Sequence, residues 1–122
     1  MTMMKTYDQC QNLYPIRGGY ANIRYPAGTS GYHSNENCEW IIQASENVTL
    51  TFTRFDMNYY AEKHEDYVAV YVGYSKVGQW DKSTGAPPVL NLRGEIKLVF
   101  RSGGITIFHG TGFDVYVQPM NI

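Results

Sequence analysis

The residues with the clearest chemical potential lie in one short polar stretch, FDMNYYAEKHEDYVAVYVG, at positions 55–73. Such a cluster of carboxylates could hold a metal ion, act as a general acid and base, or form a solvated loop with nothing bound. The choice depends on the elements that position these side chains. The carboxylates and the histidine ahead of the apolar run are Asp56, Glu62, His64, Glu65 and Asp66.

Catalysis is not favoured by the spacing of these groups. Glu65 and Asp66 are adjacent at the expected start of a strand, so their side chains point to opposite faces and cannot flank one bond. The histidines, His33, His64 and His109, are scattered, without cysteine or histidine at the spacing of a zinc site. Nucleophile-elbow and phosphate-binding glycine motifs are absent from the sequence. We therefore expect a protein that is not an enzyme.

The elements around the polar stretch are expected to be strands. Runs 38–43, 48–53, 96–100 and 113–117 alternate apolar and polar residues, which is typical of strands with one buried face. Run 67–72 is apolar on both faces and is expected in the middle of a sheet. Glycine, proline and asparagine signals, including a turn at 45–47, separate the runs. This pattern predicts an all-β fold, an antiparallel β-sandwich or barrel.

The same pattern places the acidic stretch in a loop at one end of the sandwich. The strand before it ends near Phe55, and the next begins at Asp66 or Tyr67. Strands hold such end loops in place while leaving their side chains free to vary, so binding sites often lie there.

Length and charge narrow the class of protein. A chain of 122 residues fits a single domain, 1–122, with one core. The net charge of -1 and a pI near 6.3 give no reason to expect nucleic acid or an anionic membrane as partner. No apolar stretch approaches the roughly 20 residues of a membrane span.

The cysteines leave two readings open. Cys10 and Cys38 are either buried thiols in a cytosolic domain or one disulfide in an oxidising compartment. Eleven tyrosines, twelve glycines and a charged fraction of 17% favour a secreted, extracellular β-domain. The triplet from Asn47 to Thr49 makes Asn47 a candidate glycosylation site.

A series of motifs follows one order along the chain: Cys10, Tyr25-Pro26, Tyr32, NENCEW at 35–40, VTLTF at 48–52, FD at 55–56, DYV at 66–68, VYVG at 70–73, IKLVFRS at 96–102 and GFDVY at 112–116. Together they resemble the CUB domain family over residues 10–118. The resemblance implies an extracellular β-sandwich with jelly-roll-like topology and a disulfide between Cys10 and Cys38. Such a cross-link stabilises a fold by about 3–4 kcal/mol. Both cysteines of the family's usual second disulfide are absent from this chain, so no unpaired thiol is left over.

Many members of that family bind calcium at one end of the sandwich, and the resemblance maps their three carboxylate ligands onto this chain. Asp66 is present, but the other two positions hold Asn58 and Gly103. Because calcium affinity follows the number of carboxylates, we expect no cofactor. A weak calcium site at Asp66 and Asn58 is the alternative.

The main hypothesis is a binding module that recognises a protein or glycan ligand through loops at one end, with 58–66, 74–80 and 102–112 as the candidate segments. Tyr67 and Tyr71 are expected in the core, as is Trp40. Exposed aromatic side chains give large contact area at small entropic cost, against the alternative of ordinary surface packing. The candidates for ligand contact are Tyr59, Tyr60, Tyr74 and Trp80.

Two alternatives remain from the sequence. A tyrosine-rich β-domain with one cross-link would also serve as a structural or self-assembling protein of an extracellular matrix or coat, a homo-oligomer in that case. The other alternative is that the chain is one module excised from a larger receptor or protease.

Overall fold

The computed structural model describes residues 5–28, 31–57, 66–104 and 110–120, and it confirms the expected all-β architecture. Neighbouring strands follow the order β1-β2-β7-β3-β6-β4-β5, and every pair is antiparallel except β1 with β2. No helix capable of crossing a membrane occurs in the described ranges. The strands are β1 (Thr6–Tyr7), β2 (Ala21–Tyr25), β3 (Asn37–Asp56), β4 (Tyr67–Val72), β5 (Ser75–Trp80), β6 (Leu90–Arg101) and β7 (Gly112–Pro119).

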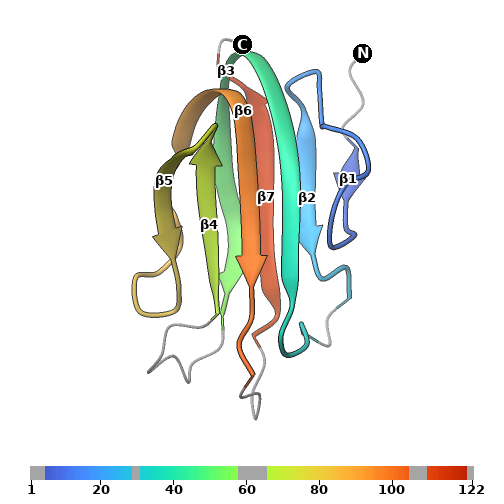
Figure 1. Ribbon diagram of the computed structural model, residues 1–122, viewed down its shortest axis with the longest axis vertical. Coiled ribbons are helices and arrows are strands. Elements are labelled where there is room, and N and C mark those ends of the chain that lie inside the picture. Colours follow the sequence, from blue (N-terminus) through green and yellow to red (C-terminus); the bar gives the residue numbers. More distant parts are fainter. Residues whose placement is uncertain (1–4, 29–30, 58–65, 105–109, 121–122) are drawn as a thin grey trace.

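Strand β3 belongs to both layers of the sandwich. The sequence predicted two strands separated by a turn at 45–47, whereas the structure has one strand of 20 residues. Its pairing register shifts between Ala44 and Val48, where the strand bends over the upper end of the molecule in Figure 1. Extra residues in a strand produce a bulge and a bend while the strand continues. The prediction of a turn at 45–47 is therefore wrong, because the structure has a bulge there. Before the bend β3 pairs with β6, and after it with β7 as well.

The core fills the space between the two layers. Trp40 is fully buried, as expected, and its ring centroid lies 5.6 Å from that of Phe113 and 5.7 Å from that of Tyr25. These contacts join β3 of one layer to β7 and β2 of the other. Aromatic pairs of this kind contribute about 0.5–1.5 kcal/mol each beyond the apolar area that they bury.

A disulfide secures the segment that follows β1. Cys10 and Cys38 are bonded, with a Cα–Cα distance of 4.7 Å, which confirms the implied pairing. The chain after Cys10 continues beside β3, where the Ile16 amide donates to the Ile41 carbonyl. The Trp40 indole N–H donates to the carbonyl of Gln9 at 2.9 Å. Residues 9–16 therefore cover the edge of the first half of β3 that does not pair with β6.

Candidate functional site

The loop end is defined as the described parts of three segments: 26–28 with 31–36, 57 with 66, and 102–104 with 110–111. It lies at the lower end of the sandwich in Figure 1. These segments follow β2, β3 and β6 and precede β3, β4 and β7. The expected position of the acidic stretch is confirmed, because β3 ends at Asp56 and β4 begins at Tyr67. Residues 58–65 of that stretch, including Asn58, Tyr59 and Tyr60, lie outside the described residues.

Asp66 joins all three segments of the loop end. Its side chain is buried, with 5% of the residue exposed. One carboxylate oxygen accepts the hydroxyl of Tyr32 at 2.7 Å, and the other accepts the backbone N–H of Gly103 at 2.7 Å. Hydrogen bonds to an ionised acceptor are about twice as strong as those between neutral groups. Asp66 thus fixes the separation of segments that are far apart in the sequence.

Glu36 makes a second junction at the same end. Its carboxylate accepts the backbone N–H of His33 at 2.9 Å and the hydroxyl of Tyr25. Burial, followed by the contact with this carboxylate, raises the pKa of Tyr25 well above its usual range. The Glu36 amide donates to Ser102 Oγ at 2.8 Å, and the Ser102 hydroxyl donates to the His33 carbonyl at 2.6 Å. The segment before β3 is therefore held to the segment after β6.

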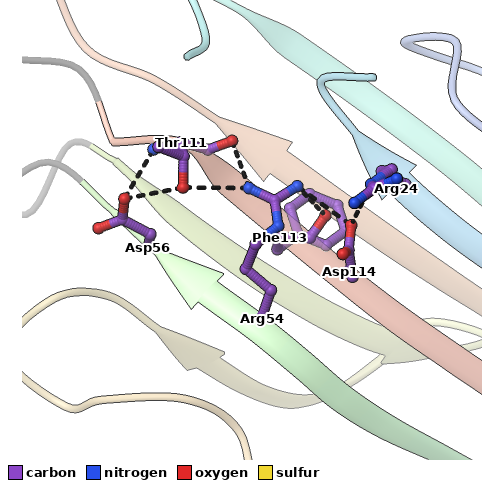
Figure 2. Close-up of polar contacts among 6 residues, drawn as sticks. All are labelled: Arg24, Arg54, Asp56, Thr111, Phe113 and Asp114. Carbon is purple, nitrogen blue, oxygen red and sulfur yellow. Dashed lines mark hydrogen bonds and ion pairs between the residues drawn. The ribbon is translucent and has the colours of Figure 1, made fainter. Parts of the chain in front are cut away.

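A third junction ties the end of β3 to the start of β7, as Figure 2 shows. Asp56 accepts the backbone N–H of Thr111 at 2.9 Å and the Thr111 hydroxyl at 2.8 Å. Arg54 donates to the Thr111 carbonyl at 2.6 Å. A Cβ on Gly110 would lie 2.1 Å from the Asp56 carbonyl oxygen, so this close approach requires glycine. The three junctions hold the bases of the end loops.

The described residues do not assemble a calcium site. Calcium takes about 6–8 oxygen ligands, and the described loop end offers the carboxylates of Asp66 and Glu36, whose oxygens already accept hydrogen bonds. At Gly103 the chain presents an N–H donor where the family supplies a carboxylate. The one described cluster of three ligand-type groups is Cys10, Glu36 and Cys38, and its sulfurs are joined in the disulfide.

The remaining ligand-binding candidates do not meet at the loop end. Tyr74 is fully exposed in the turn between β4 and β5, which lies at the opposite end of β4 from Asp66. Trp80 is the last residue of β5 and is half-buried against the core, with its ring packed over Gly78. The expectation that segment 74–80 joins the other loops at one end is therefore wrong for Tyr74. It is wrong because β4 runs the full height of the layer before the chain turns.

Tyr67 and Tyr71 are also placed differently from the expectation. The sequence predicted both in the core, but they are half-buried on the outer face of β4, while Val68 and Val70 face inward. Period-two alternation shows which face of a strand points to the core only when the other face is polar. In this strand the face with Ala69 is apolar as well, so the sequence did not distinguish the two faces.

Sequence reasoning missed Glu36 and Ser102 at the loop end, and it used Tyr32 only as a motif landmark. The sequence offers no local signal for them, because their partners are distant in the chain. The Tyr32 hydroxyl reaches across 34 residues to Asp66, and the Glu36 amide reaches across 66 to Ser102.

Comparisons with known proteins converge on one family. A family model described as CUB domain matches residues 10–114. Cubilin of Rattus norvegicus is 29% identical over 102 residues, which is 80% of this chain and 3% of cubilin. Neuropilin-1 of Gallus gallus is 33% identical over 116 residues, which is 88% of this chain and 12% of that protein. The chain therefore spans a small part of the length of these relatives.

Solved structures agree at the level of the fold. The CUB1-EGF-CUB2 domains of rat MASP-1 match with a TM-score of 0.74 and 21% identity, covering 89% of this chain and 43% of that one. The MASP-1 CUB2 domain bound to Ca2+ matches with a TM-score of 0.71 and 21% identity, covering 84% and 95%.

Proposed function

Because the chain belongs to the CUB domain family, we propose that it is a non-catalytic extracellular module that recognises a protein or a glycan through its loop end. The modules of its relatives cubilin and neuropilin are extracellular and bind proteins, and CUB domains in general are not catalytic. The disulfide between Cys10 and Cys38 supports an oxidising compartment.

The observation that carries the proposal is the buried carboxylate of Asp66, which bridges Tyr32 and Gly103. A buried acidic group that orients loops lowers the entropy lost when those loops meet a ligand. Glu36 and Asp56 do the same for neighbouring segments. The described part of this frame is made by the chain's own hydrogen bonds, so the proposal requires no metal ion.

The experiment is a binding screen of the purified chain against a panel of secreted proteins and of glycans. Each ligand found is then titrated with a variant carrying Tyr59→Ala and Tyr60→Ala. The matched control is Tyr14→Ala, because Tyr14 is 79% exposed and lies beside residues 39–42 in the first half of β3, outside the loop end. The proposal predicts weaker binding by the double variant and unchanged binding by the control. Equal binding by both, together with unchanged binding by Asp66→Ala, would overturn it.

A further inference from the structure

The outer face of the layer formed by β3, β6 and β4 carries side chains in a regular array. Directly paired residues lie side by side across an antiparallel sheet, about 4.5–5.5 Å apart. Each row of the array consists of a β6 residue with one neighbour on either side. The rows are Arg101 between Asn37 and Tyr67, Val99 between Glu39 and Ala69, and Lys97 between Ile41 and Tyr71.

The middle of this array is hollow. Residues of β3, β4 and β6 together with the turn after β4 line a hollow of about 320 Å³. Its floor is Val99, and the ends are two pairs of a tyrosine and a cation, Tyr67 with Arg101 and Tyr71 with Lys97. We call these five residues the tyrosine–cation face. Tyr74, fully exposed, stands at its upper rim.

The cations of this face are incompletely neutralised. Lys97 Nζ lies 3.9 Å from a carboxylate oxygen of Glu39, and both side chains are nearly half exposed. Arg101 is exposed and forms no ion pair within the described part of the chain. An exposed ion pair at this distance contributes little to stability, because water screens the two charges. The face is therefore open to an additional anion.

We propose that the tyrosine–cation face binds an extended acidic segment of a partner protein. Lys97 and Arg101 are four residues apart in β6, which places their Cα atoms about 13 Å apart at about 3.3 Å per residue. An extended ligand segment presents side chains on one side at every second residue. Carboxylates at ligand positions i and i+4 therefore match the two cations, and the side chain at i+2 lies over Val99.

The chemistry of the face specifies the rest of the segment. Val99 is 4% exposed and apolar, so the ligand residue above it is small or apolar. Tyr67 and Tyr71 lie beside Arg101 and Lys97 along the path and supply aromatic contact area. This surface lies on the flat of a layer and adjoins the loop end at Tyr67 and Arg101. The inference uses none of the loop-end hydrogen bonds, so it does not rest on the proposed loop-end ligand.

The test is an NMR titration of the isotope-labelled chain with the peptide acetyl-Gly-Glu-Ser-Val-Ser-Glu-Gly-amide. The control peptide, acetyl-Gly-Glu-Val-Ser-Glu-Ser-Gly-amide, has the same composition, but its carboxylates point to opposite sides. The matched protein variants are Arg101→Gln and Arg24→Gln, since Arg24 is an arginine on the outer face of the other layer.

The expected result is that the first peptide shifts the resonances of Lys97, Val99 and Arg101, and that the control peptide binds more weakly. Arg101→Gln should weaken binding about tenfold, because a charge-assisted contact is lost, while Arg24→Gln should match the wild type. Equal binding of both peptides, or no loss in Arg101→Gln, would overturn the proposal. Shifts at these residues with a heparin hexasaccharide and none with the peptide would overturn it as well.

Discussion

The two outer faces of the sandwich each carry a pair of cations, but the position of the nearest carboxylate differs. On the layer of β2, β7 and β3, Asp114 lies directly between Arg24 and Arg54, at 3.2 and 3.0 Å (Figure 2). On the tyrosine–cation face the central position between the cations holds Val99. The comparison teaches that a pair of cations is structural when a carboxylate lies between the two charges and available when an apolar residue lies there.

The largest effect is expected when the carboxylate between Arg24 and Arg54 is removed. Asp114→Asn leaves Arg24 and the partly buried Arg54 without their counter-charge, and the side chain of Asp114 is only 15% exposed. We expect the free energy of unfolding in urea to fall by about 2–3 kcal/mol. The matched variant Glu39→Gln, beside the tyrosine–cation face, should lower the free energy of unfolding by less than about 0.5 kcal/mol. Equal losses in the two variants would contradict the distinction between the faces.

The loop end extends the comparison, since Asp66 is a carboxylate whose two oxygens are both in use. Asp66→Ala leaves the Tyr32 hydroxyl and the Gly103 N–H without their buried acceptor. We expect a loss of about 2 kcal/mol in urea unfolding, with a smaller loss for Asp66→Asn, which keeps one acceptor oxygen. A loss below that of Glu39→Gln would show that Asp66 does not hold the loops.

Tyr25 gives a pH test of the second junction. Its pKa is raised in the folded state, which keeps the proton that the unfolded state releases above about pH 10. The stability that this group contributes is therefore present below that pH and is lost as pH rises further. Urea unfolding at pH 8 and pH 10.5 should show a smaller alkaline loss for Tyr25→Phe than for the wild type. The same loss in both would show that the folded state does not hold the Tyr25 proton more tightly than the unfolded state.

Calcium should have the smallest effect. Because hydrogen bonds already satisfy Asp66, the thermal midpoint in EDTA should equal that in millimolar calcium. A ligand at about 100 times its dissociation constant stabilises a protein by about 2.7 kcal/mol. A saturable rise of several degrees, absent with magnesium and lost in Asp66→Ala, would mean that residues beyond those described complete a metal site.

Local patterns predicted the strands because period-two alternation reflects burial on one side. They placed the end of β3 and the start of β4 correctly on either side of the acidic stretch. The family resemblance supplied the pairing of the disulfide. The bend in β3 was read as a turn, because polar residues at 45–47 signal an exposed kink without saying whether pairing continues.

The candidate site was less predictable, because its geometry comes from long-range packing. Nothing near Asp66 in the sequence indicates Tyr32 or Gly103 as partners. The array around Val99 depends on the register of three strands, and a shift of one residue would turn Lys97 and Arg101 to the core. Residue types alone could not show that one cation pair encloses a carboxylate and the other does not.

The central claim is that the position of a carboxylate decides whether a cation pair is free to bind. The most direct test is the dissociation constant of the acidic peptide for Glu39→Gln, which removes the only carboxylate paired with the described tyrosine–cation face. The account predicts tighter binding, by about two- to fivefold, and misfolding could not produce such a gain. Unchanged or weaker binding would contradict it.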